Sequence, residues 1–180
     1  MPRRSKGSLI LRASLATDGV DYQSTQIDIA SLVDVPKGEV LLIKRAWIAF
    51  SNESNNNAPA ATQWPAAAGP AVSADSQVTA MATALTHVAM QPMSNADAIV
   101  KTYCFGAVDA SQNWTFFEIF NLMRPQEFDN GMYIATDQIH CAVDVGVALQ
   151  AELEVSFVFE CETVTLSREQ ALDLAVSLQQ

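Results

Sequence analysis

The chain has 180 residues, of which 49% are hydrophobic and 17% carry a charge. This length suits one large domain with a sizeable core, and no apolar run approaches the ~18 residues that a membrane-spanning helix needs. The formal net charge is −10, but four positive charges and no acid fall in the first twelve residues. The sequence therefore predicts a short basic arm, residues 1–7, on an acidic body.

The basic arm has two interpretations. It is either a solvated segment or a segment that contacts the phosphates of a nucleic acid. In the second case the contact residues are Arg3, Arg4, Lys6 and Arg12, and the contact is weak because four charges neutralise few phosphates. The apolar residues after the arm stop at Arg12, so no secretory signal follows, and we expect synthesis in a cytoplasm.

Alternation of apolar and polar residues predicts most of the chain as β-strands. In chain order, the predicted strands span residues 8–16, 23–30, 40–51, 77–85, 98–108, 114–123, 132–144 and 149–165. The segment 77–85 is rich in Ala and Thr, so a helix is the alternative there. Turn sequences such as Asp18-Gly19 and Asn130-Gly131 separate the strands.

The clearest of these strands runs from Leu149 to Thr165, about twice the usual length of ~5–6 residues. Its odd positions from residue 151 to residue 161 are apolar, which predicts a long interior strand with one buried face. Its even positions carry Glu152, Glu154, Glu160 and Glu162. This acidic face is either a solvated surface or part of a divalent cation site, to which a second element would have to add oxygen ligands.

Two segments depart from the β pattern. Residues 52–75 hold three consecutive asparagines and an Ala/Pro-rich stretch with Trp64 as its only large side chain, which predicts a long functional loop. Residues 167–178 change to a helical period, with Ser167 and Gln170 as a capping box. Such a short helix is not stable alone, so its apolar stripe must pack on its own domain or on a neighbour. The stripe consists of Ala171, Leu174, Ala175 and Leu178.

No motif predicts a catalytic residue, a metal site or a cofactor. The two histidines, His87 and His140, lie far apart and lack the H-x-H pattern of a metal-binding cupin. His140 and Cys141 are adjacent, so on a strand they point to opposite faces and cannot form a nucleophile–base pair. A pair of His87 with Cys104 is a minor alternative. The three cysteines have no CxxC spacing, and we expect reduced thiols.

Taken together, these features resemble the single jelly-roll capsid proteins of small or tailless icosahedral viruses. The resemblance rests on the basic arm, about eight strands, the long Asn/Ala/Pro loop and the low charge density. It covers nearly the whole chain as a pattern, without a shared residue motif. It implies an all-β, eight-stranded jelly-roll β-sandwich over residues 8–166, followed by a short C-terminal helical tail over residues 167–180.

The same resemblance implies a structural virion protein that is not an enzyme and that binds copies of itself and other virion proteins. Trp64 and the apolar stripe of the tail would then lie at subunit interfaces. Other functions use similar sandwiches. The first alternative is a carbohydrate-binding module in which Trp64, Trp114 or Tyr133 stacks on a sugar, and the second is a metal-dependent cupin-type enzyme.

Overall fold

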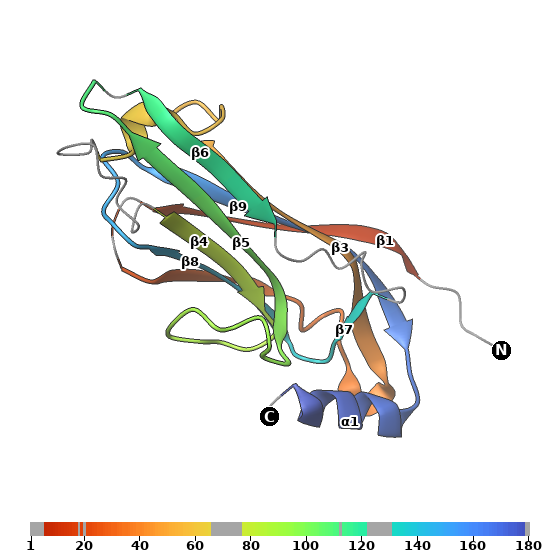
Figure 1. Ribbon diagram of the computed structural model, residues 1–180. Helices are drawn as coiled ribbons and strands as arrows, with labels where there is room; N and C mark the ends of the chain where they lie inside the picture. The colour runs from red at the N-terminus through yellow and green to blue at the C-terminus, as the bar shows by residue number, and fades with distance from the viewer. Residues whose placement is uncertain are drawn as a thin grey trace.

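In the computed structural model, the described residues are 6–17, 19, 21–65, 77–111, 113–121 and 131–178, and they form two antiparallel sheets packed as a sandwich (Figure 1). The described strands are β1 (Lys6–Thr17), β2 (Gln23–Asp28), β3 (Glu39–Asn52), β4 (Gln77–Thr83), β5 (Ala98–Val108), β6 (Trp114–Asn121), β7 (Met132–Ile134), β8 (Gln138–Val145) and β9 (Leu153–Thr165). Helix α1 spans Arg168–Ser177, and two 3-10 turns, η1 and η2, span Val35–Lys37 and Ala61–Gln63.

The strand order is that of a jelly roll. Sheet A has the order β1-β9-β3-β7 and sheet B has the order β2-β8-β4-β5-β6. The first half of the chain pairs with the second half in reverse, because β1 pairs with β9, β2 with β8, β3 with β7 and β4 with β5. Folding such a long hairpin over itself gives two Greek keys in a sandwich, so the predicted fold class is confirmed.

The described chain has nine strands rather than eight, because the predicted strand 132–144 is two strands. β7 pairs with β3 in sheet A, whereas β8 pairs with β2 and β4 in sheet B. Residues 135–137 carry the chain between the sheets, and Thr136 Oγ1 donates to Gln138 O at 2.9 Å in this bend. The residues of β7 and β8 are both largely apolar, so the sequence pattern does not show that the chain passes from sheet A to sheet B between them. The segment 77–85 forms β4, which settles the choice between strand and helix.

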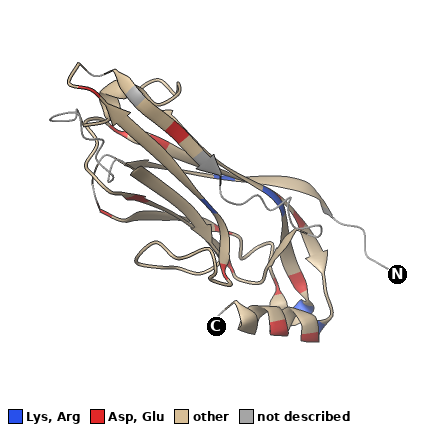
Figure 2. Cartoon of the chain, in the orientation of Figure 1, with Lys and Arg blue, Asp and Glu red and all other residues tan. Residues whose placement is uncertain are grey.

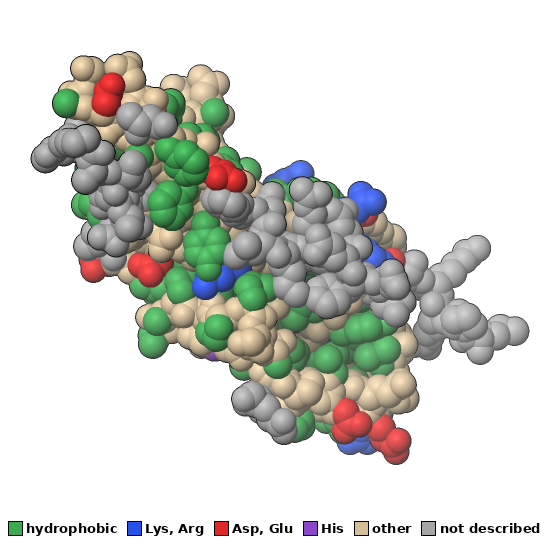
Figure 3. Space-filling view, in the orientation of Figure 1, with side chains coloured by type: hydrophobic (Ala, Val, Ile, Leu, Met, Phe, Trp, Pro, Cys, Tyr) green, Lys and Arg blue, Asp and Glu red, His purple; other side chains and the backbone are tan. Residues whose placement is uncertain are grey.

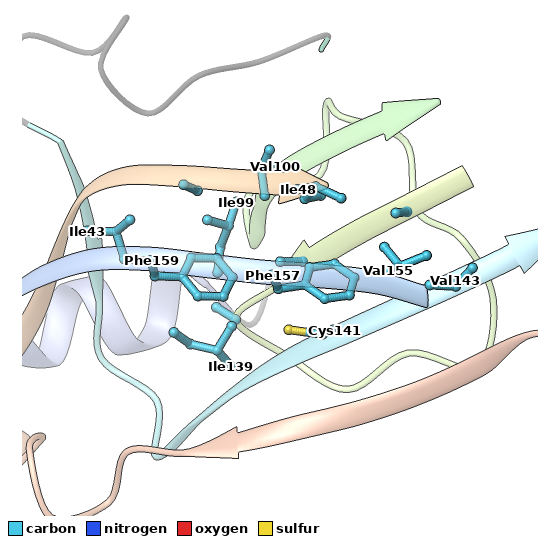
Figure 4. Packing of buried hydrophobic residues seen from close by; sticks show 14 of the residues in the cluster. Ile43, Ile48, Ile99, Val100, Ile139, Cys141, Val143, Val155, Phe157 and Phe159 are labelled. Carbon is cyan, nitrogen blue, oxygen red and sulfur yellow. The ribbon is translucent and has the colours of Figure 1, made fainter. Parts of the chain in front are cut away.

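β9 is an interior strand, as predicted, between β1 and β3. Its odd positions from Leu153 to Thr163 are buried. Phe157 and Phe159 are fully buried between the sheets, near Ile43 and Ile139 (Figure 4). The strand begins later than residue 149 because Gln150 N donates to Gln63 O instead of to a neighbouring strand.

Helix α1 follows β9 directly and packs against η1 and β7 (Figure 1). The predicted capping box is confirmed: Gln170 N donates to Ser167 Oγ and Ser167 N donates to Gln170 Oε1, both at 3.2 Å. Gly38, at the end of η1, has a φ of 77° and lies so close to Leu166 O that a Cβ would be 2.3 Å from that oxygen. No helix in the described part of the chain is long and apolar enough to cross a membrane.

Replacing Phe157 by Ala should lower the free energy of unfolding by about 3–5 kcal/mol, because it removes a fully buried ring from the core. Chemical denaturation measures this loss. Val158→Ala is the matched control on the partly exposed face of the same strand, and it should cost less than about 1 kcal/mol. Equal losses in the two variants would contradict the assignment of the faces.

Candidate functional site

Trp64 lies in the core and not at the surface. Its exposed fraction is 0%, and its ring packs edge-on against Trp114 and Phe117 at centroid distances of 5.2 and 5.9 Å. Gly106 of β5 makes room for it, since a Cβ there would lie 2.5 Å from Trp64 Nε1. The prediction that Trp64 lies at a subunit interface is therefore wrong, because a side chain without exposed surface cannot contact another chain.

The segment before Trp64 is bonded to the chain that leads into β9. Ala60 N donates to Gln63 Oε1 at 2.8 Å, Gln63 Nε2 donates to Glu152 O, and Gln150 N donates to Gln63 O at 2.8 Å. Residues 60–63 of the predicted loop thus pack on their own domain, whereas residues 53–58 are exposed. Residues 66–75 of that loop lie outside the described residues.

The predicted stripe of α1 also packs on its own domain. Ala171 and Leu178 are buried, and Leu174 and Ala175 pack against the same core. The predicted docking of this stripe on its own domain is therefore seen, and a subunit contact through the partly exposed Leu174 and Ala175 stays a prediction. A second apolar pair, Leu172 and Val176, is 43% and 57% exposed. These two residues are one turn apart, so we call them the exposed stripe of α1.

Only two of the four basic residues predicted to contact nucleic acid lie among the described residues. Arg3 and Arg4 lie outside the described residues, and Lys6 already belongs to β1. Arg12 is exposed on the outer face of sheet A, and basic positions lie on both β1 and β3 (Figure 2). Nothing in the described chain shows whether these residues contact nucleic acid, so that contact stays a prediction.

The outer face of sheet A also carries the only tryptophan with a largely exposed ring among the described residues. Trp47 is 45% exposed, and both Trp47 and Arg12 pair with Val158 of β9. Trp47 was not among the aromatic residues predicted to stack on a ligand, which were Trp64, Trp114 and Tyr133. The alternation of β3 could have shown it, because Ile48 and Phe50 face the core and place Trp47 on the opposite face.

The acidic face of β9 is paired with cations from β3. Lys44 Nζ lies 2.8 Å from Glu162 Oε1, and Arg45 Nη1 lies 3.6 Å from Glu160 Oε2. These side chains are partly exposed, so each pair contributes at most about 1 kcal/mol. No group of three His, Cys, Asp or Glu side chains in the described part of the chain is placed to hold a metal ion.

All three cysteines are buried and free. Burial raises the pKa of each thiol to about 12, with the Glu160 charge adding to the effect at Cys161. Cys141 belongs to the core between the sheets, whereas the His140 ring contacts Tyr22 from the segment before β2, so these neighbours on β8 point to opposite faces as predicted. Because the thiolate is the reactive form, the cysteines are packing residues.

The native protein should not react with a water-soluble aromatic disulfide reagent at about pH 8, because its thiols are buried and protonated. All three thiols should react once the chain is unfolded in guanidinium chloride. Absorbance of the released thiolate follows the reaction. Rapid modification of one thiol in the folded protein would contradict this description.

The two histidines meet on the outer face of sheet B, although they are far apart in the sequence. His87 Nε2 lies 2.6 Å from Asp97 Oδ2, and Tyr22 Oη lies 3.2 Å from His140 Nε2. The pKa of His140 is lowered by its burial and then by the positive charge of His87. We call these four residues the histidine cluster.

The histidine cluster was not predicted from the sequence, because it depends on the fold of the chain between β4 and β5. Asp97 is 1% exposed and also accepts from Leu85 N at 3.3 Å. Neither imidazole is hydrogen-bonded to a Ser, Thr or Cys side chain among the described residues.

Comparison with known proteins finds no family model that matches this chain and no curated protein that matches its sequence.

Proposed function

We propose that this protein is a self-assembling capsid subunit, a structural component of a virion and not an enzyme. The observation that carries the proposal is that large apolar side chains are exposed on several separate parts of a jelly roll. They lie on the outer face of sheet A (Ile10, Trp47), on the β4–β5 connection (Val88), on β6 (Phe116, Ile119) and on α1 (Leu172, Val176). A ligand-binding module needs one such surface, whereas a subunit of a closed shell contacts neighbours on several sides.

The strand β6 supports assembly most directly. It is the last strand of sheet B in the described chain, and both of its faces are apolar, with Phe116 on one and Ile119 on the other. Monomeric proteins protect edge strands with charges, prolines or bulges, and β6 has one charge, Glu118, and one register shift near its start, opposite Ala107 and Val108. Hydrophobic side chains gather over β5 and β6, where Phe105 and Phe116 stack edge-on at 6.4 Å (Figure 3).

Low charge also favours a shell subunit. Charged residues make up 17% of the chain, and part of this charge on sheet A is already paired between Lys44 and Glu162 and between Arg45 and Glu160. Contact between copies of such a surface removes few charged side chains from water, although the net charge of −10 opposes their approach. We propose that the basic arm and Arg12 make a weak contact with the genome. We also propose that the protein is made in the host cytoplasm and then becomes part of the virion.

A carbohydrate-binding module is the second candidate. The observation that favours it is the exposed ring of Trp47 on a flat sheet face, with Arg12 in the same row. The residues first considered fit less well, because Trp64 is buried and Trp114 packs against Phe117 at 4.6 Å. Electron microscopy of the purified protein separates the two functions, since a shell subunit forms closed particles and a binding module does not.

Replacing Leu172 by Asp should reduce assembly while the chain stays folded, because Leu172 is on the exposed stripe of α1. Sedimentation and electron microscopy measure particle formation, and circular dichroism measures folding. Leu174→Asp is the matched control on the side of α1 that packs against the core. It places a charge against the core, so it should lower the free energy of unfolding by several kcal/mol. Wild-type protein that stays monomeric at high concentration under several salt conditions would refute the shell proposal.

Removing residues 1–5 should reduce the nucleic acid inside the particles while shells still form, because this change deletes Arg3 and Arg4 and leaves β1 intact. The ratio of absorbance at the nucleic-acid and protein maxima of purified particles measures the packaged material. Unchanged packaging would remove the arm's role in genome contact and leave the shell proposal standing.

A further inference from the structure

The four edge strands of the two sheets differ in how well they are protected from other chains. In the described part of the chain these strands are β1 and β7 of sheet A and β2 and β6 of sheet B. An edge strand has backbone N–H and C=O groups that no neighbouring strand binds, so it can pair with a strand of another chain. Charged side chains, prolines and short length prevent such pairing.

Three of the four edges have this protection. β7 has only three residues. β2 has the polar sequence QSTQID, in which Ile27 is the one apolar residue. β1 carries two positive charges, Lys6 and Arg12. Each of these strands is therefore a poor partner for an apolar strand.

β6 lacks most of this protection. It lies on the free side of β5, and its sequence WTFFEIFN has no proline and one charge, Glu118 (Figure 1). After the register shift near its start, residues 116–121 pair regularly with β5. Phe116 is 44% exposed and Ile119 is 42% exposed, on opposite faces of the strand. A suitable partner is an extended strand that is apolar on both faces and brings little charge.

We propose that this partner is β6 of a second copy, which pairs antiparallel with β6 around a two-fold axis. The inference rests on the proposed self-assembly and names one of its contacts. β6 itself meets both requirements, whereas β1, β2 and β7 do not. The pairing joins the two B sheets into one and puts the Phe116 rings of both copies on a common outer face.

The charge of Glu118 limits the register of the pairing. Residues directly opposite in an antiparallel pair share a face, so the two-fold axis passes through one residue of β6 and its copy. An axis at Glu118 would place two carboxylates directly opposite each other, which is unfavourable. An axis at Phe117 or Ile119 moves the two Glu118 side chains to diagonal positions, about 7–8 Å apart. We infer one of these two registers.

A pairing of this kind ends at two copies. The same edge is used in both chains, so the contact is closed and does not grow into a fibre. Other surfaces, such as the exposed stripe of α1, would then join the pairs into a shell. The β6 contact therefore defines a dimer as the unit from which the shell is built.

Cysteine cross-linking tests the pairing on the full-length protein, at a salt concentration that screens the net charge of −10. The native thiols are buried, so Glu118→Cys supplies the reactive one, and labelling with a monofunctional maleimide checks its access. A bismaleimide with a reach of about 8 Å should link two copies and make the dimer the main product on a denaturing gel. Val88→Cys is the control: Val88 is 91% exposed but lies away from β6, and it should give little dimer.

A second substitution tests whether the edge itself is responsible. Ile119→Lys, added to Glu118→Cys, puts a charge on the edge and should abolish the cross-linked dimer. Ser24→Lys, added in the same way, changes the polar edge strand β2 and should leave the dimer intact. Circular dichroism shows that each variant is folded.

The outcomes separate this inference from the shell proposal. Particles seen by electron microscopy for Glu118→Cys, together with an accessible thiol and no cross-linked dimer, would overturn the β6 pairing and leave the shell proposal standing. An undiminished dimer after Ile119→Lys would also overturn the pairing. A cross-linked dimer that never forms particles would support the pairing and count against the shell.

Discussion

The structure depends on the position of β9 between β1 and β3. This pairing joins the last strand to the first and third strands in one sheet, so sheet A cannot close until nearly the whole chain is present. Folding that rests on such distant pairings is slow compared with folding through local contacts. A register slip of one residue would expose Phe157 and bury Glu160, so the apolar face and the Arg45–Glu160 pair specify the same register.

The two ends of the sandwich are covered by the segment that holds Trp64 and by helix α1, the two segments that the sequence predicted to lie at subunit interfaces. Trp64 fills the space below β5 and β6, and Gly106 is needed there because any larger residue would overlap the indole. At the other end, α1 covers the core with Ala171 and Leu178. Because Trp64 and most of the α1 stripe pack inside the domain, the proposed subunit contacts would need other exposed residues, such as Phe116 on β6 and Leu172 on α1.

Much of the fold could be predicted because alternation reports which face of a strand is buried. It located the strands and, with the capping box, the C-terminal helix. It could not show that residues 135–137 cross between sheets, since Ile134 and Ile139 are buried on both sides of the crossing. It also could not place Trp64, which lies in a segment without periodicity. The histidine cluster depends on the register of β4 and β8 and on a connection that folds back, which no local pattern encodes.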